Sequence, residues 1–149
     1  MIQTILGANG VIGRGVSNQL ASMGKPVRQV SRNPKKVNET DQTFVADLLR
    51  FEDVDRAVAG SEVTYLLAGL PYKTKEWQTQ WPKVMRHAID ACKKHSSKLV
   101  FFNNVYAYGH VQGIMTEATP FNPCSKKERC ALLLPQHCSM KSSKGIFKR

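Results

Sequence analysis

The sequence predicts an α/β fold built as a doubly wound parallel sheet of about five strands, and two patterns carry this prediction. Short apolar segments of four to six residues alternate with longer segments in which apolar residues recur every three or four positions. Glycines mark several junctions, as at Gly24, which precedes Pro26, and at Gly60. Strands that alternate with helices favour a parallel sheet, because parallel neighbours need a crossover and a helix supplies it.

Each expected element rests on its own pattern. Strands are predicted over residues 2–6, 27–31, 43–46, 63–68 and 98–102, and helices over 11–23, 51–59 and 74–95. The continuous apolar run at 63–68 is typical of a strand buried on both faces. Pro82 predicts a kink in the third helix or a later start.

All three helices carry apolar residues that we expect to face the sheet. The second helix places Val54, Ala57 and Val58 inward. The first helix places Val11, Ile12, Val16, Leu20 and Met23 on one side. The third helix places Trp77, Trp81, Val84, Met85, Ala88 and Cys92 on one side.

Gly7, Gly10 and Gly13 follow the first strand directly and open the first helix. In such a turn, backbone N–H groups and the positive helix end can approach a pyrophosphate. A side chain at the first two glycines would hold phosphates away, and one at the third would push the helix from the strand. The spacing is G-x-x-G-x-x-G rather than G-x-G-x-x-G. We therefore predict a dinucleotide site here, with a plain tight turn as the alternative.

The end of the second strand predicts which dinucleotide binds. NAD-binding folds usually place an acid there for the ribose 2′-hydroxyl. Here Ser31 and Arg32 occupy that place, and no acid occurs before Glu39. Arg32 could pair with a 2′-phosphate while Ser31 adds a hydroxyl, so the prediction is NADP, with NAD as the alternative. Arg28 and Lys35 would either reinforce the positive field or be plain surface charges. For Arg32, the other interpretation is a solvated surface arginine.

Composition and charge narrow the class of protein. The 149 residues are 42% hydrophobic and 22% charged, which is typical of one globular domain. No run has membrane-spanning length, and a first strand at residue 2 leaves no room for a signal peptide, so we expect a cytoplasmic protein with reduced cysteines.

The net charge of +11 is concentrated near the C-terminus. Residues 1–124 hold 15 Lys and Arg against 10 Asp and Glu, whereas residues 125–149 hold seven against one. Nucleic-acid binding through this tail is not expected, because it lacks an organised basic helix or interleaved aromatic residues. Cys124, Cys130, His137 and Cys138 match no standard zinc spacing, so no metal site is expected either.

Several segments occur in an order and at spacings that match a known family. They are residues 7–13, Ser-Arg-Asn-Pro at 31–34, Ala-Asp-Leu at 46–48, Ala-Gly-Ser-Glu-Val at 59–63, Leu-Ala-Gly at 67–69, the segment 102–109 and Glu-Ala-Thr-Pro at 117–120. Over about residues 1–127 the chain resembles the NAD-dependent epimerase/dehydratase family, an extended or atypical short-chain dehydrogenase/reductase. The resemblance implies a Rossmann NAD(P)-binding fold and an oxidoreductase or epimerase activity in full-length relatives.

The resemblance also implies roles for residues beyond the glycine loop. Asp47 would meet the adenine amino group, the Leu48 backbone would support the ring, and residues 68–70 would line the cofactor. Together with the residues deduced above, the expected cofactor-binding set is Gly7, Asn9, Gly10, Val11, Ile12, Gly13, Ser31, Arg32, Asp47, Leu48, Ala68, Gly69, Leu70 and Asn103.

The chain departs from the family where catalysis would occur. Asn103 and Asn104 stand where members commonly have Ser-Ser or Ser-Thr. The family's Tyr-x-x-x-Lys pair, in which the lysine lowers the tyrosine pKa, has no counterpart, because no tyrosine lies four residues before Lys126 or Lys127. Tyr108 is interpreted as a structural aromatic residue. Lys127 is considered separately as a contact to the cofactor ribose, with less support. The catalytic residues are therefore unknown, and so is whether the chain is an enzyme.

Two segments are expected: residues 1–127 as the NAD(P)-binding Rossmann domain and residues 128–149 as an irregular basic tail. Atypical members continue with Gly-Glu-Val-Arg-Ala after two lysines. Codons for Glu128-Arg129-Cys130-Ala131 can be written so that one added base in front of them encodes Gly-Glu-Val-Arg, so we hypothesise that the tail is out-of-frame sequence. A natural short protein with a disordered tail is the alternative. A truncated domain would leave the fifth strand at an edge and favour self-association.

Three functions follow from the sequence. The first is the NADP-preferring dinucleotide-binding domain of an epimerase/dehydratase-like oxidoreductase, inactive alone, with a small-molecule substrate only in a full-length relative. The second is a non-catalytic NADP(H)-sensing module. The third, nucleic-acid binding through the tail, has the least support.

Overall fold

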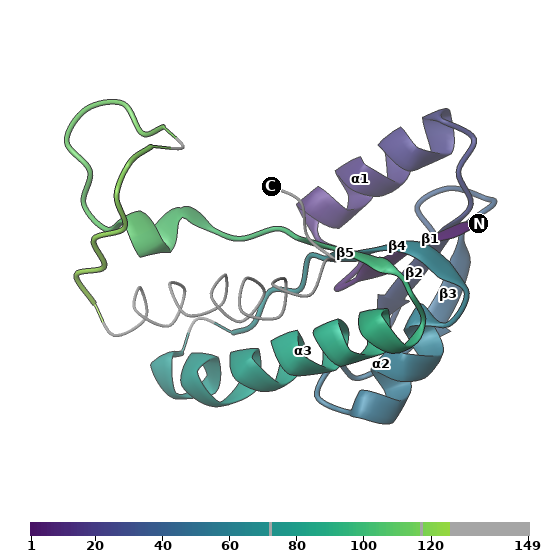
Figure 1. Ribbon diagram of the computed structural model, residues 1–149. Coiled ribbons are helices and arrows are strands. Elements are labelled where there is room, and N and C mark those ends of the chain that lie inside the picture. The colour runs from purple at the N-terminus through teal and green to yellow at the C-terminus, as the bar shows by residue number, and fades with distance from the viewer. Residues whose placement is uncertain (72, 117, 126–149) are drawn as a thin grey trace. The chain divides into compact units, whose positions relative to one another are not determined.

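Five strands form one parallel sheet: β1 (Ile2–Leu6), β2 (Val27–Ser31), β3 (Gln42–Val45), β4 (Ser61–Leu66) and β5 (Lys98–Phe101). Their order across the sheet is β3-β2-β1-β4-β5, and every neighbouring pair is parallel (Figure 1). Because successive strands run outward from β1 first in one direction and then in the other, the order reverses between β1 and β4. Open sheets of this kind bind ligands beyond the carboxyl ends of the strands at such a reversal.

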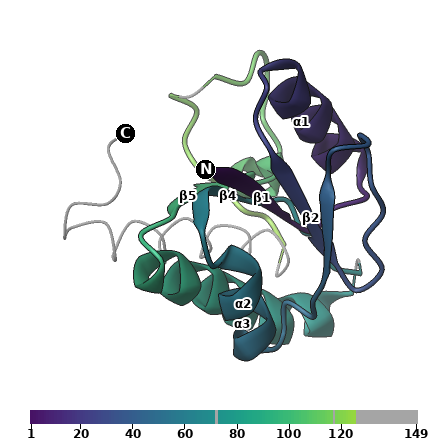
Figure 2. The same ribbon diagram turned by 90° about the vertical axis from the view of Figure 1, so that its right-hand side faces the viewer.

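The predicted doubly wound fold is confirmed, since helices cover both faces of the sheet. Helix α1 (Val11–Ser22) lies on one face, and α2 (Phe51–Val58) lies on the other with the C-terminal part of α3 (Thr74–Lys94) (Figure 2). Among the described residues, no helix is both long enough and apolar enough to cross a membrane.

The computed structural model describes residues 1–71, 73–116 and 118–125, in two units. The first unit, Met1–Gly69 with Arg86–Phe102, contains the whole sheet. The second contains Leu70–Met85 and the chain from Asn103 onward. The expected domain boundary at residue 127 and the tail 128–149 lie outside the described residues and remain predictions.

Helix α1 presents a different face to the sheet than its apolar stripe predicts. Its buried residues are Gly13, Ser17 and Leu20. Val11 is 89% exposed, and Ile12 and Met23 are also exposed. The prediction holds for Leu20, which is buried, and for Val16, which packs against the core. It is wrong for the other three residues, because the polar Ser17 faces inward to bond the buried Asp41 carboxylate, with Oγ 3.1 Å from Oδ2. The expected end of the helix is confirmed: Gly24 has φ +67°, and the Lys25 N–H donates to the Leu20 carbonyl at 2.9 Å.

Strand β4 also differs from its expectation, both in bounds and in burial. It begins two residues earlier than predicted, and Val63 and Tyr65 are only half-buried, whereas Thr64 and Leu66 are fully buried. Within the unit that contains the sheet, α1 is the only helix on the face of Val63 and Tyr65, and it lies over β1 and β2 (Figure 2). Burial on both faces was therefore a wrong expectation for this strand.

The helices of the opposite face match their predicted inward residues. Val54, Ala57 and Val58 of α2 are buried. Helix α3 continues through Pro82, so a helix start at this proline is excluded. All six stripe residues of α3 are buried, namely Trp77, Trp81, Val84, Met85, Ala88 and Cys92.

The second unit is organised by aromatic side chains. Trp77 meets Trp81 edge to face with ring centroids 5.9 Å apart, and it lies 6.0 Å from Tyr106. Tyr106 belongs to the short 3-10 helix η1 (Val105–Tyr108). Tyr108 packs against Phe121 at 4.8 Å, which agrees with a structural role for this tyrosine.

Candidate dinucleotide site

The glycine loop begins at Gly7, where β1 passes close to the chain that follows β4. Gly7 has φ +88°, and a Cβ at this position would clash with the backbone N and Cα of Ala68. The Gly7 and Ala8 N–H groups both donate to the Val30 carbonyl at 3.0 Å. Gly7 is therefore required by the packing of the loop on the chain that follows β4, in addition to its predicted part in the approach of phosphates.

The other two glycines play different parts. Nothing lies within 4 Å of a Cβ built on Gly10, so the space beside it is open. A Cβ on Gly13 would lie 3.6 Å from Ala8 Cα, which is an ordinary contact. A small side chain at this position would therefore not push the helix from the strand, contrary to the prediction. Of the three, Gly10 is the glycine whose missing side chain leaves space for a ligand.

The N-terminus of α1 opens onto that space without a side-chain cap. Gly10 is the N-cap residue, it has no capping side chain, and the first turn carries no acidic residue. The first N–H groups of a helix have no partner within the helix, and the helix dipole places positive potential there. With Val11 and Ile12 exposed beside them, these N–H groups are placed where they could hold an anion such as a pyrophosphate.

Asn9 connects the glycine loop to the segment that follows β2. Its backbone has φ +83°. Its Nδ2 donates to Ser31 Oγ at 3.2 Å and to the Asn33 carbonyl at 2.7 Å, and its Oδ1 accepts from the Lys35 N–H at 3.1 Å. These bonds place residues 31–35 directly beside the glycine loop.

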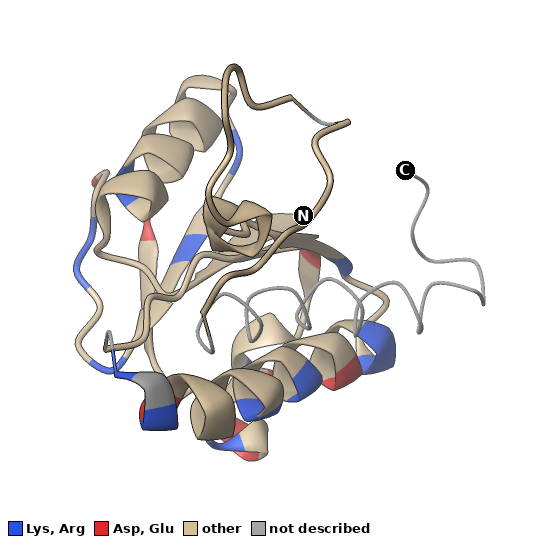
Figure 3. Ribbon diagram, turned by 90° about the vertical axis from the view of Figure 1, so that its left-hand side faces the viewer, with Lys and Arg blue, Asp and Glu red and all other residues tan. Residues whose placement is uncertain are grey.

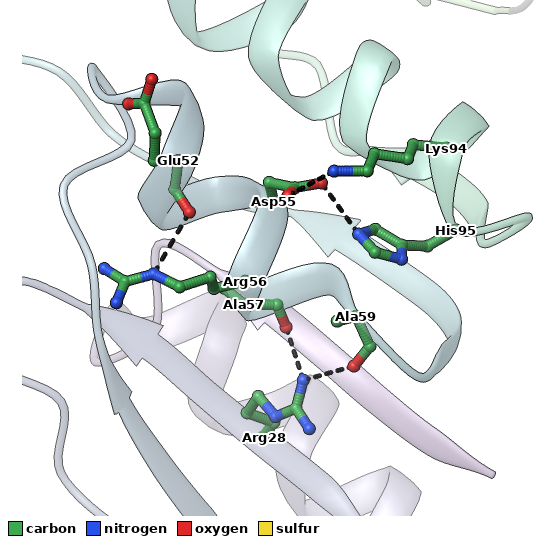
Figure 4. A network of polar contacts seen from close by, with 8 residues as sticks. All are labelled: Arg28, Glu52, Asp55, Arg56, Ala57, Ala59, Lys94 and His95. Atoms are coloured by element: carbon green, nitrogen blue, oxygen red, sulfur yellow. Dashed lines mark hydrogen bonds and ion pairs between the residues drawn. The ribbon is translucent and has the colours of Figure 1, made fainter.

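Arg32 and Arg28 have opposite environments although both were considered for the site. Arg32 is exposed, and among the described residues its side chain makes no hydrogen bond or ion pair. Arg28 Nη1 donates to the carbonyls of Ala57 at 2.6 Å and Ala59 at 2.9 Å, at the end of α2 (Figure 4). Burial lowers the pKa of the Arg28 guanidinium. The expectation that Arg28 reinforces the field at the site is therefore wrong, because this cation holds a helix end.

A buried carboxylate anchors the far end of the segment after β2. Asp41, 2% exposed, accepts hydrogen bonds through Oδ2 from Gln29 Nε2 at 2.8 Å and from the Val37 and Asn38 N–H groups at 3.0 Å. Burial by itself raises the pKa of this carboxyl, but the hydrogen bonds outweigh it and the pKa is lowered. Sequence reasoning missed Asp41, because its partners are side chains and turns that no local pattern predicts.

Asp47 and Leu48, expected at the adenine ring, follow β3 in a loop held on both sides. The Asp47 N–H donates to Asp53 Oδ2 and Asp47 Oδ1 accepts from the Leu49 N–H, both at 3.0 Å. His87 Nδ1 donates to the Leu48 carbonyl at 3.0 Å, and its ring packs on Phe51 at 5.9 Å. His87 carries no sequence signal for this contact, since it lies on a helix almost forty residues further along the chain.

The remaining expected residues divide between the two units. Ala68 and Gly69 follow β4 in the first unit, where Ala68 touches the glycine loop. Leu70 and Asn103 belong to the second unit, in which Asn103 Oδ1 accepts from the Asn104 N–H at 2.9 Å. Glu117, Lys126 and Lys127 lie outside the described residues. Among the described residues, no group of three His, Cys, Asp or Glu side chains is placed to hold a metal.

Comparison with known proteins decides the family. A family described as NAD(P)H-binding matches residues 7–128. The chain belongs to this NAD(P)H-binding family. Its cofactor is therefore a nicotinamide dinucleotide, as the glycine loop predicts. The sequence matches no curated protein.

Solved structures show the same fold in longer proteins. A UDP-glucose 4-epimerase aligns with a TM-score of 0.85 at 15% identity, over 99% of this chain and 49% of its own. Uronate dehydrogenase from Agrobacterium tumefaciens gives 0.83 at 18% identity, over 97% and 56%. A UDP-glucose 4-epimerase from Thermus thermophilus in complex with NAD gives 0.83 at 19% identity, over 97% and 51%.

The chain thus spans about half the length of these structures. At such identities the likeness concerns the fold, and at that level the resemblance to the epimerase/dehydratase and short-chain dehydrogenase/reductase proteins is confirmed. The chain is an NAD(P)-binding domain that shares the fold of these proteins.

Proposed function

We propose that the chain binds NADP(H) in preference to NAD(H). The pyrophosphate would lie at Gly10 and the open N-terminus of α1, and the 2′-phosphate would lie at Arg32. One combined observation carries this proposal. Arg32 is exposed and has no partner among the described residues, and no acidic residue lies between Ser31 and Glu39 to bind a ribose 2′-hydroxyl.

The geometry of the loop supports this assignment. A ribose that extends from the pyrophosphate at α1 reaches the carboxyl end of β2, the position at which such folds select the cofactor. Asn9 holds residues 31–35 beside the glycine loop, so Arg32 belongs to the same surface as the phosphate site. A guanidinium presents a planar fork of donors that fits a phosphate dianion.

The other expected contacts complete the proposed site. Asp47 and Leu48 would meet the adenine, and Ala68 and Gly69 would line the cofactor beyond β4. Leu70 and Asn103 of the second unit are proposed as further contacts on the strength of the family resemblance alone.

We propose that residues 1–127 form the cofactor-binding part of an epimerase/dehydratase-like oxidoreductase and that the chain is inactive alone. Similar solved structures are named as an epimerase and a dehydrogenase, which supports a sugar-nucleotide or carbonyl substrate in a longer form. The sequence lacks the Tyr-x-x-x-Lys pair that would exchange the proton. The same absence favours the second candidate, a non-catalytic module that responds to NADP(H), and turnover of any carbonyl substrate would exclude it.

Equilibrium titration of the chain with NADPH and with NADH tests the proposal. We expect saturable binding that favours NADPH, and Arg32→Ala should weaken NADPH about 10- to 100-fold, the usual worth of hydrogen bonds to a charged group. NADH binding should change little. Arg86→Ala is the matched control, because Arg86 is an exposed arginine of α3, a helix that carries both basic and acidic residues (Figure 3). Equal affinity for both cofactors would refute the assignment of Arg32.

A further inference from the structure

The side chain of Asn9 is fully engaged within the protein. An asparagine amide offers two N–H donors and one carbonyl acceptor. Both donors are used by Ser31 Oγ and the Asn33 carbonyl, and the acceptor is used by the Lys35 N–H. This side chain therefore faces the segment after β2 and has no donor left for a pyrophosphate.

The three bonds bracket Arg32. Ser31 precedes it, Asn33 follows it, and Lys35 lies two residues further along the chain. Ser31 Oγ also accepts from the Asn33 N–H at 3.2 Å. The residues on either side of Arg32 are therefore bonded to each other and to the Asn9 amide. Arg32 itself is exposed, and among the described residues its side chain makes no hydrogen bond or ion pair.

We propose that Asn9 is a positioning residue that makes the site selective for NADP(H), by holding residues 31–35 so that Arg32 is presented to the 2′-phosphate. This inference rests on the proposed function, and it adds a residue whose action on selectivity passes through Arg32 rather than through direct contact with the cofactor.

Asparagine is suited to this position for two reasons. The backbone at Asn9 has φ +83°, a region that asparagine tolerates better than most residues and that glycine adopts freely. The segment also requires two donors and one acceptor from one short side chain. Aspartate would keep the acceptor but lose both donors, and its charge would face the Asn33 carbonyl.

The same segment has a second anchor at its other end. Asp41 accepts from the Val37 and Asn38 N–H groups, so residues 31–38 are fixed to the glycine loop at one end and to a buried carboxylate at the other. Removal of the Asn9 side chain would release only the end of the segment that carries Arg32. A substitution of Asn9 therefore tests the inference more specifically than a substitution of Asp41.

Asn9→Gly removes the side chain without adding backbone strain, and a double-mutant cycle with Arg32→Ala tests how it acts. We expect Asn9→Gly to raise the NADPH dissociation constant about 10-fold, as loss of one to two hydrogen bonds would, and the NADH constant less than about 2-fold. In the Arg32→Ala background, Asn9→Gly should change the NADPH to NADH ratio no further. Asn18→Gly on the exposed side of α1 controls for the flexibility that glycine adds, and it should leave both constants unchanged.

Two outcomes would overturn the inference. Equal weakening of NADPH and NADH by Asn9→Gly would mean that Asn9 serves the pyrophosphate or the fold in general. An equal shift of the ratio with and without Arg32 would mean that Asn9 does not act through this arginine. If the wild-type chain does not prefer NADPH at all, the proposed function fails instead, and the titrations separate these cases.

Amide hydrogen exchange of the cofactor-free chain checks the structural step by itself. The Lys35 N–H, which donates to Asn9 Oδ1, should exchange faster in Asn9→Gly and at the wild-type rate in Asn18→Gly. Unchanged exchange at Lys35 would refute the connection between the two loops, whatever the cofactor affinities are.

Discussion

The two ends of the sheet use polar groups in opposite ways. At the amino end, polar side chains satisfy one another: Thr64 Oγ1 and Ser97 Oγ share a hydrogen bond at 2.8 Å, and Asp55 accepts from Lys94 and His95 at 2.8 Å each (Figure 4). The hydrogen bond from Lys94 lowers the pKa of Asp55 against the opposing effect of burial. At the carboxyl end, the first N–H groups of α1 and the Arg32 guanidinium are left without protein partners among the described residues.

This difference separates stability from binding. Paired polar groups contribute to the folded state and have nothing further to offer a ligand, whereas unpaired donors at an exposed edge are available to an anion. Arg28 and Arg32 show the contrast within four residues of one chain segment, since the first is engaged with carbonyls and the second is exposed. The interpretation would fail if substitutions of the paired groups at the amino end changed cofactor affinity, or if substitutions of the unpaired groups at the carboxyl end changed the free energy of unfolding.

The largest expected contrast is between two glycines of one loop. Gly7→Ala should destabilise the fold by about 3 kcal/mol or more, because a Cβ would meet the Ala68 backbone at a strained φ of +88°. Gly10→Ala should leave the unfolding free energy within about 0.5 kcal/mol, since nothing lies near its Cβ, yet it should weaken NADPH and NADH equally by crowding the pyrophosphate. Urea denaturation and cofactor titration measure both. A stable Gly7→Ala variant would contradict the close approach of the two strands.

The next effect concerns the buried carboxylate of Asp41. Asp41→Asn should lower the free energy of unfolding at neutral pH by about 1–3 kcal/mol, because it leaves buried donors poorly matched. Since the folded pKa is lowered, the contribution of this carboxylate is present above its unfolded pKa of about 3.9 and is lost as pH falls through the folded value.

The difference between wild type and Asp41→Asn should therefore shrink in acid. Denaturation at pH 7, 5 and 3 follows it, with Glu39→Gln as a control at an exposed acid of the same segment. A difference that stays constant over this range would show that the Asp41 charge does not contribute.

A smaller effect is expected at Arg28, and it sharpens the comparison with Arg32. Arg28→Ala removes two hydrogen bonds to the carbonyls at the end of α2 and should cost about 1–2 kcal/mol of stability. The ratio of NADPH to NADH affinity should stay unchanged, whereas Arg32→Ala should change the ratio and leave stability unchanged. Thermal denaturation and titration of both variants test this. If Arg28→Ala altered the ratio as strongly as Arg32→Ala, the division between the two ends would fail.

Sequence patterns predicted those features whose causes are local. The strand runs, the Gly24 helix end and the glycine loop each depend on residues within one turn or strand. The inward face of α1 was predicted only in part: Leu20 is buried as expected, but Ser17 also faces inward, to meet Asp41, which lies 24 residues away. Arg28 and Arg32 carry the same charge in the sequence. Only their positions in the fold distinguish them, since Arg28 lies near the start of β2 and contacts a helix end, whereas Arg32 follows the strand and is a candidate ligand contact. Asn9 was expected to bind the cofactor, but its partners could not be deduced before the two loops were placed together.

The smallest expected effect concerns His87, which holds the loop of Asp47 and Leu48. His87→Ala should cost about 1 kcal/mol of stability and weaken NADPH and NADH alike by a few fold, because both cofactors share the adenine that this loop is proposed to meet. His87→Asn, whose amide can still donate to the Leu48 carbonyl, should recover part of the affinity. Isothermal titration of the three proteins separates the outcomes. An altered NADPH to NADH ratio would place the influence of His87 at the 2′-phosphate instead, and so would show that the carboxyl end of the sheet is coupled more widely than through Asn9.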